Sequence, residues 1–231
     1  CEYLKEKKIE LISSGEGNSN AVGEHALGLL LSLSKKITKS NTEMKNGIRK
    51  REENRGFEIE GKTIGLIGYG KTGKSFAKKL SGFNCNIIFC DIKTNLGDNY
   101  AREVKINELK ETSDIISLHT NLNQSSRHII DKQFIDDCKK SFCLINTARG
   151  ECISNHDLIY GLENDKIIGA GLDVLENENK DFEGIAVDQN LDKLKKFDNV
   201  ILTPHIAGWS KESKVKLAQI TVNKIKEFLD L

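Results

Sequence analysis

Residues 62–73 read Lys-Thr-Ile-Gly-Leu-Ile-Gly-Tyr-Gly-Lys-Thr-Gly, and they determine the architecture of the chain. The apolar run at 63–67 is typical of a buried parallel strand, and a helical pattern follows it. Between them, Gly68, Gly70 and Gly73 have the Gly-x-Gly-x-x-Gly spacing of a strand–turn–helix unit that holds a pyrophosphate against the helix N-terminus. A glycine-rich turn without a ligand is the alternative explanation of the same spacing.

A second apolar segment, residues 86–91, ends at Asp91, eighteen residues after Gly73. A carboxylate in this place can accept hydrogen bonds from a ribose diol. An acidic residue there favours NAD over NADP, because a 2′-phosphate would meet a like charge. Strand, turn, helix and acid together predict a dinucleotide site and make the turn without a ligand the weaker explanation.

Composition excludes several classes of partner. The chain has 231 residues with 38% hydrophobic content, and its 35 Lys and Arg nearly balance its 34 Asp and Glu. Because no long run of like charge stands out, neither nucleic acid nor a membrane is an implied partner. The six cysteines lack zinc-type spacing, so we expect no metal site, reduced thiols and a cytoplasmic protein.

Strand and helix signals alternate along the rest of the chain. This order predicts an α/β fold with a doubly wound parallel sheet covered on both faces. The predicted strands are 9–13, 63–67, 86–91, 114–119, 141–146, 167–175 and 200–203. The predicted helices are 2–8, 21–37, one through Phe76 and Leu80, 106–110, 131–138, one that begins at Ser154, and 210–229, whereas 47–61 and 176–199 are expected to be irregular.

Polar residues cluster after the last three of these strands. Ligands bind beyond the carboxyl ends of the strands in an open parallel sheet, and Arg149, Asp173 and His205 follow successive strand ends. Arg149 can hold a carboxylate by paired charged hydrogen bonds, and His205 can exchange a proton near neutral pH. Glu178 or Glu176 could orient His205. This set fits reduction of a carbonyl beside a carboxylate.

Each of these residues has an ordinary structural explanation when it is taken alone. Arg149 could form a surface ion pair, Glu178 could belong to a solvated loop, and His205 could be a core histidine. Glu24 and His25, near the start of the apolar helix at 21–37, are interpreted as structural because an isolated histidine is seldom a functional group. The argument for chemistry rests on the shared edge of the sheet.

Five ordered motifs also carry a family resemblance. They are Gly68-Tyr-Gly-Lys-Thr-Gly73, His119-Thr-Asn-Leu, Asn146-Thr-Ala-Arg-Gly150, Gly169-Ala-Gly-Leu-Asp-Val174 and Thr203-Pro-His-Ile-Ala-Gly208. The chain resembles the D-isomer-specific 2-hydroxyacid dehydrogenases, the phosphoglycerate dehydrogenase-like branch included. The resemblance implies an NAD-dependent oxidoreductase that interconverts a 2-hydroxy acid and a 2-keto acid, and it includes a 2-hydroxy acid similar to 3-phosphoglycerate among the candidates.

The resemblance assigns roles to individual residues. It makes Arg149 the substrate-binding arginine, His205 the acid/base and Glu178 its partner. The spacing of Arg149 and Glu178 matches the family, so Glu178 is preferred to Glu176. The cofactor-binding residues would be Gly68, Gly70, Lys71, Thr72, Gly73, Asp91, His119, Thr120, Thr147, Ala148, Arg149, Asp173, His205 and Gly208. Asn121 and Asn179 stand where the family usually has prolines.

The resemblance also predicts the domain organisation. Residues 1–20 would be the remnant of a substrate domain, 21–208 the dinucleotide-binding domain, and 209–231 a C-terminal helix that returns toward the substrate domain. A long linking helix at 21–46 would form a homodimer interface. Because most of a substrate domain is missing, the chain is expected to be a fragment. The alternative function is an NAD(H)-binding regulatory or structural module without turnover, as in related corepressors.

Overall fold

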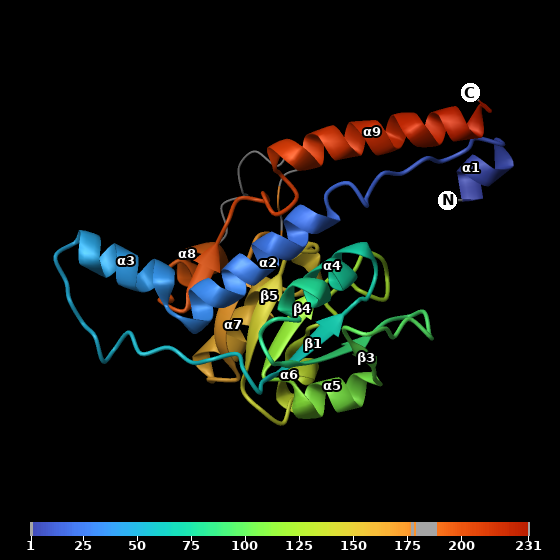
Figure 1. Ribbon diagram of the computed structural model, residues 1–231. Helices are drawn as coiled ribbons and strands as arrows, with labels where there is room; N and C mark the ends of the chain where they lie inside the picture. Colours follow the sequence, from blue (N-terminus) through green and yellow to red (C-terminus); the bar gives the residue numbers. More distant parts are fainter. Residues whose placement is uncertain (1, 177, 179–188, 231) are drawn as a thin grey trace.

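The computed structural model describes residues 2–176, 178 and 189–230. In this part of the chain seven parallel strands form one sheet with the order β3-β2-β1-β4-β5-β6-β7 (Figure 1). This arrangement confirms the predicted doubly wound sheet. The strands are β1 (Thr63–Ile67), β2 (Asn86–Cys90), β3 (Arg102–Glu103), β4 (Ile115–Leu118), β5 (Phe142–Asn146), β6 (Ile167–Leu172) and β7 (Val200–Leu202).

Helices cover both faces of the sheet because its strands are apolar on both faces. Ile115 and Ile145 face one cluster of buried side chains, and their neighbours Ile116 and Leu144 face the other. The first cluster includes α2 (Ser19–Ser34) and α4 (Lys71–Leu80). The second includes α5 (Ile106–Thr112), α6 (Lys132–Asp137), α7 (Asn155–Glu163) and α8 (Gln189–Leu194). Because a shift of one residue would move apolar side chains out of these two clusters, the clusters fix the register of the strands.

The linking helix predicted over 21–46 is interrupted. α2 ends at Ser34, Lys36 adopts a left-handed conformation with φ 51°, and α3 (Ile37–Lys45) begins after it. The backbone N–H of Phe57 donates to the carbonyl of Ser34 at 2.8 Å. The segment that contains Phe57 therefore crosses the end of α2 and uses a carbonyl that a continuous helix would need. α3 projects beyond the sheet (Figure 1), and none of its residues is buried.

α2 is also covered within its own chain to a large extent. Ala26, Leu29 and Leu30 are buried against α4 and the strands β5 to β7. Leu27 and Leu31 are half-buried. The apolar composition of this helix is therefore explained in part by intramolecular packing.

The N-terminal segment was assigned wrongly in one place. Residues 9–13 form no strand, and they run along α9 (Lys211–Phe228), where Lys224 Nζ donates to the carbonyl of Ser13 at 2.6 Å. α9 and this segment extend away from the sheet, with α1 (Glu2–Glu6) at their far end (Figure 1). An isolated segment of this kind has no neighbouring strand with which to pair.

Three short elements were not predicted: β3, the 3-10 helix η1 (Gly150–Cys152), and α8, which lies in the segment expected to be irregular. Within that segment, residue 177 and residues 179–188, which include Asn179, lie outside the described residues. Among the helices of the described residues, none combines the length and the apolar character needed to span a membrane.

Candidate active site

Strand register places the predicted site residues in one row. Ile67 of β1 pairs with Cys90 and Leu118, and the same level continues through Asn146 and Leu172 to Leu202. One residue further along each strand, the chain leaves the sheet at its carboxyl edge. The residues at that level are Gly68, Asp91, His119, Thr147, Asp173 and Thr203. The structure therefore brings together groups that come from six separate parts of the sequence.

The glycine turn has the close approaches that its spacing predicts. Gly68 has φ 94°, and a Cβ on Gly73 would lie 2.4 Å from the carbonyl oxygen of Gly68. Gly70 has nothing within 4 Å of the position where a Cβ would project, so its backbone faces open space beside the N-terminus of α4. A pyrophosphate can approach the backbone there.

Asp91 is held in place by the backbone around it. Oδ2 accepts a hydrogen bond from the N–H of Tyr69 at 2.7 Å, and Oδ1 accepts one from the N–H of Lys93 at 2.9 Å. A carboxylate has about four lone-pair sites, so acceptor capacity remains for a ribose diol. The Tyr69 ring is buried and stacks on Phe89. The turn and the acid therefore form one rigid unit.

Polar atoms beside this turn also fit a polar ligand. Among the described residues, Thr147 Oγ1 and His119 Nδ1 are buried and have no hydrogen-bond partner. Such atoms are costly unless something satisfies them. Thr120 Oγ1 lies 3.4 Å from the thiol of Cys152. The residues at this edge of the sheet thus fit the dinucleotide that the sequence predicts.

Burial controls the charge of His119. It lowers the pKa of His119 to about 3, since a buried imidazolium loses its hydration. Nε2 lies 2.9 Å from Ser117 Oγ. His119 is therefore neutral near pH 7 and acts as a hydrogen-bonding group, not as a cation.

Asn146 holds the loop that carries Arg149. Its side chain accepts from the N–H of Ala148 at 3.0 Å and donates to the carbonyl of Arg149 at 3.0 Å. Arg149 is exposed, and its Nη1 donates to the carbonyl of Ala148 at 2.6 Å. The guanidinium is thus presented at the carboxyl edge, where it can bind an anion.

The next residue fixes this loop against the end of β6. A Cβ on Gly150 would lie 1.9 Å from the carbonyl oxygen of Leu175. Only glycine permits two backbones to come this close. The Arg149 loop and the segment that leads to Glu178 are therefore locked together.

His205 and Glu178 form the predicted pair. His205 Nδ1 lies 2.7 Å from Glu178 Oε2, and the other carboxylate oxygen accepts from the N–H of Leu175 at 2.7 Å. Glu176 has different partners: Oε1 lies 3.1 Å from His128 Nε2, and Oε2 accepts from the N–H of Asn155. The geometry favours Glu178 over Glu176 as the carboxylate beside His205.

Asp173 lies beneath the same loop. It is 1% exposed, and its carboxylate accepts from the N–H groups of Ile206 and Ala207 at 2.9 and 2.7 Å. Its expected contact with a nicotinamide amide would use the acceptor capacity that remains. Gly208 packs against Asn18, where a Cβ would lie 2.7 Å from Nδ2.

Lys71 and Thr72 form the first turn of α4, in the expected phosphate position. The side chain of Lys71 pairs with Glu16, which also pairs with Lys224 of α9. Hydrogen bonds from Lys224 and Lys71 lower the pKa of Glu16 to about 2. Sequence reasoning did not find Glu16, because nothing near it marks a link between segments so far apart.

Three further residues were missed or interpreted as structural. Asn146 and Thr203 were quoted within motifs but were given no role, although an asparagine at the end of an apolar strand is itself a signal for a side-chain-capped turn. His25 of α2 lies 2.9 Å from Thr203 Oγ1. Its position at this edge was not visible in the sequence.

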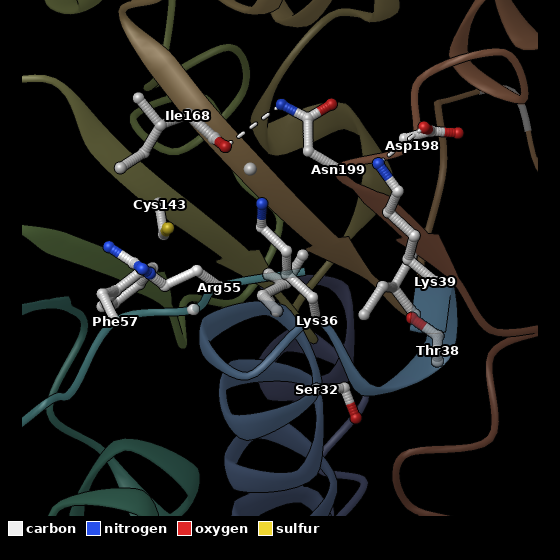
Figure 2. Close-up of a pocket in the computed structure, with 14 residues that line it drawn as sticks. Ser32, Lys36, Thr38, Lys39, Arg55, Phe57, Cys143, Ile168, Asp198 and Asn199 are labelled. Atoms are coloured by element: carbon white, nitrogen blue, oxygen red, sulfur yellow. Dashed lines mark hydrogen bonds and ion pairs between the residues drawn. The ribbon is translucent and has the colours of Figure 1, made fainter. Parts of the chain in front are cut away.

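The cavity drawn in Figure 2 lies at the opposite edge of the sheet. It has a volume of about 180 Å³ and lies between the break of α2 and α3 and the first residues of β6 and β7. Two of its polar side chains already have partners within the lining: Lys39 Nζ lies 2.9 Å from Asp198, and Asn199 Nδ2 donates to the backbone carbonyl of Ile168 at 3.1 Å (Figure 2). It is separate from the candidate active site.

Comparisons with known proteins agree with this geometry. The sequence model described as "D-isomer specific 2-hydroxyacid dehydrogenase, NAD binding domain" matches residues 27–207. Hydroxypyruvate reductase of Thermotoga maritima is 34% identical over 221 residues, which are 96% of this chain and 70% of that protein. D-3-phosphoglycerate dehydrogenase of Methanocaldococcus jannaschii is 34% identical over 233 residues, which are 99% of this chain and 43% of that protein.

A solved structure is similar as well. The NAD-complexed D-isomer specific 2-hydroxyacid dehydrogenase of Lactobacillus delbrueckii ssp. bulgaricus superposes with a TM-score of 0.80 at 29% identity. The match covers 89% of this chain and 67% of that one. This chain spans 43% to 70% of the length of these three proteins.

Proposed function

The chain belongs to the D-isomer specific 2-hydroxyacid dehydrogenase family and contains its NAD-binding domain, and on this basis we propose that its protein is an oxidoreductase. The proposed reaction transfers a hydride between NAD(H) and a 2-hydroxy acid/2-keto acid pair. The observation that carries the proposal is the His205–Glu178 pair at 2.7 Å, which lies at the same edge of the sheet as Arg149.

The cofactor would lie along the row of strand ends. Gly70 and the first turn of α4, with Lys71 and Thr72, would hold its pyrophosphate, and Asp91 would hold the adenosine ribose. Thr147 and Asp173 would meet its nicotinamide end. When bound, NADH supplies the hydride.

Three side chains would bind the substrate and supply the proton. Arg149 would bind the carboxylate of the 2-keto acid through charged hydrogen bonds and orient its carbonyl. Since Nδ1 of His205 is committed to Glu178, the proton for the carbonyl oxygen would leave from Nε2. Glu178 would stabilise the imidazolium before the transfer and fix the ring orientation. The product would be the 2-hydroxy acid, with His205 neutral.

The substrate is proposed at the level of its class. Arg149 accounts for the carboxylate and His205 for the neighbouring carbonyl, and the relatives' names include hydroxypyruvate and 3-phosphoglycerate. We propose a short 2-hydroxy acid and the corresponding 2-keto acid as the substrate pair. Residues 1–20 would belong to a substrate domain, 21–208 to the cofactor domain, and 209–231 to a helix that returns to the substrate domain.

We also propose a cytoplasmic homodimer. Five cysteines among the described residues are free, which supports a reducing compartment. Ile37 and Met44 on α3 are 51% and 59% exposed. Their exposure beside the half-buried side chains of α2 supports a second copy as the partner of this surface.

The test uses the full-length protein, NADH and a panel of 2-keto acids that includes glyoxylate, pyruvate and hydroxypyruvate. We expect NADH oxidation with at least one of them. His205→Ala should reduce kcat by about a thousandfold or more and leave the NADH dissociation constant within about twofold. An exposed histidine of α7, His156, provides the matched control variant His156→Ala. NADH binding without oxidation across the panel would instead support the regulatory module.

A further inference from the structure

The loop that carries the proposed acid/base has a strained backbone. His205 has φ 54°, in the left-handed region that residues with a Cβ seldom occupy. Such a conformation persists only where its surroundings determine it. Whatever fixes this loop therefore also fixes the direction of the imidazole.

Asp173 supplies most of the restraint. Its backbone carbonyl accepts from the N–H of His205 at 2.8 Å. Its carboxylate accepts from the next two N–H groups, those of Ile206 and Ala207, at 2.9 and 2.7 Å. Three successive amides thus end on one buried residue, so the orientation of the Asp173 carboxylate sets the path of the loop.

Two further side chains orient that carboxylate. The hydroxyl of Thr203 donates to Asp173 Oδ1 at 2.6 Å, and His25 Nε2 lies 2.9 Å from the same hydroxyl oxygen. Because the hydroxyl hydrogen goes to Asp173, the Thr203 oxygen must accept from His25, which requires a hydrogen on Nε2. Nε2 is also 3.4 Å from Asp173 Oδ1.

The charge of Asp173 makes this chain of donors important. Burial raises the pKa of Asp173, but hydrogen bonds from His25, Thr203 and the amides of the loop lower the pKa by more than burial raises it. The pKa of Asp173 is therefore below its ordinary value. The carboxylate is therefore ionised in a place that is 1% exposed. Removing one donor leaves a buried charge less well satisfied, and the remaining bonds rearrange around it.

His25 reaches this loop from outside it. It lies on α2, and its side chain is 22% exposed. We infer that His25 is a positioning residue for His205, which it controls through Thr203, Asp173 and the amides of residues 205–207. This inference rests on the proposed function, because it assigns His205 the role of the acid/base. It also gives a role to a residue that the sequence alone marked as structural.

The first test separates the effect of the hydrogen-bond donor on His25 from the effect of its side-chain volume. In the full-length protein, His25→Leu should lower kcat for 2-keto acid reduction about tenfold and leave the KM for the 2-keto acid, which Arg149 binds, within about twofold. His25→Gln places an amide N–H near the position of Nε2 and should recover kcat to within about threefold of the unmodified protein. The control is His156→Leu, at an exposed residue that pairs with Asp157 on α7, which should change neither constant.

A double-mutant cycle tests whether His25 acts through Thr203. Thr203→Val interrupts the same chain and should also cost about tenfold in kcat. If His25 acts through Thr203, the double variant should lose about tenfold in total, not the hundredfold that independent effects would give. Should His25→Leu fail to fold, His25→Ala removes the same donor and takes its place in the cycle.

A second readout does not depend on turnover. In the chain of residues 1–231, amide hydrogen exchange at Ile206 and Ala207, measured by NMR, should become about tenfold faster in His25→Leu and return toward the original rate in His25→Gln. Unchanged exchange, or an equal loss in His25→Gln and His25→Leu, would overturn the inference. If the unmodified protein reduces no 2-keto acid, the proposed function fails and the exchange rates alone decide whether His25 orients the loop.

Discussion

At the scale of single residues, hydrogen bonds from main-chain N–H groups fix the orientation of side chains in the candidate site. Asp91 shows this: both of its oxygens accept main-chain N–H groups, from Tyr69 and Lys93. Its carboxylate cannot turn away to make room for an additional negative group. Selectivity between the two nicotinamide cofactors should therefore depend on this one side chain.

We predict that the protein prefers NADH to NADPH and that Asp91→Ala relaxes this preference by roughly tenfold to a hundredfold, because one like-charge contact is removed. Titration of each cofactor by its fluorescence measures the ratio of the two dissociation constants. The control is Asp192→Ala on α8, at an exposed carboxylate that pairs with Lys195, which should leave the ratio unchanged. Equal affinity for both cofactors in the unmodified protein would contradict the prediction.

His119 leads to a prediction about pH. Its pKa is about 3 in the folded chain, whereas an unfolded histidine has a pKa of about 6.5. Between these values only the unfolded state binds the proton, so the free energy of unfolding falls as the pH falls below about 6.5. From pH 7.5 to pH 5 this residue should cost about 2 kcal/mol.

Urea unfolding of the unmodified chain and of His119→Gln at both pH values measures this term. Other groups titrate in both proteins, so the difference between the two pH dependences isolates His119. We expect the variant to lose about 2 kcal/mol less stability at pH 5. Parallel curves for the two proteins would show that His119 is protonated as readily in the folded state as in the unfolded one.

The position of these residues at one edge of the sheet could be predicted from sequence to the extent that strand ends could be predicted. Gly68, Asp91, Arg149, Asp173 and His205 each follow an apolar run, and parallel strands bring such positions to one edge. The choice of Glu178 over Glu176 needed the family spacing. The His25–Thr203–Asp173 chain could not be predicted, since the side of α2 that faces β7 depends on tertiary packing.

At the scale of elements, the break between α2 and α3 is the main departure from the sequence-based prediction. The pattern over 21–46 contains no proline and no glycine after Gly28, so nothing local ends the helix. The cause is a segment that crosses from further along the chain: a Cβ on Gly56 would lie 2.1 Å from the carbonyl oxygen of Ser34. Long-range contacts of this kind override helix propensity.

This contact gives a prediction with an internal control. Gly56→Ala should destabilise the chain by at least about 2 kcal/mol, because backbone atoms on both sides must move. Gly28→Ala should instead stabilise it by up to about 1 kcal/mol, since Gly28 is an exposed residue in α2 with nothing within 4 Å of its Cβ position. Thermal unfolding measures both, and a similar stability of the two variants would show that residue 56 has room for a side chain.

At the scale of the whole molecule, the sheet has a buried core on each of its faces, whereas the segments that extend beyond the sheet are largely exposed. α9 and the N-terminal segment extend from the sheet (Figure 1), and they expose large apolar side chains. α3 does the same at the other side. The sequence predicted the sheet well because alternation of elements is a local pattern, but the paths of these outer segments depend on what they pack against.

The α3 surface carries the prediction of a homodimer. Ile37→Lys combined with Met44→Lys should convert a dimer into a monomer, because each lysine must lose hydration to enter an apolar interface. Sedimentation at micromolar concentration measures the mass, and NADH titration should give an unchanged affinity. Val215→Lys, at an exposed apolar position on α9, is the control. A monomer before substitution would contradict the prediction.

The contact between Gly150 and Leu175 also constrains how the site can change during evolution. A substitution at position 150 adds a Cβ where the neighbouring carbonyl oxygen is only 1.9 Å away, so the lineage is confined to the glycine codons there. Arg149 and Glu178 are consequently inherited on two main chains that cannot drift apart by small steps. Descendants can acquire new substrates by exchanging side chains around Arg149 and Glu178, while the spacing between the two main chains passes unchanged from ancestor to descendant.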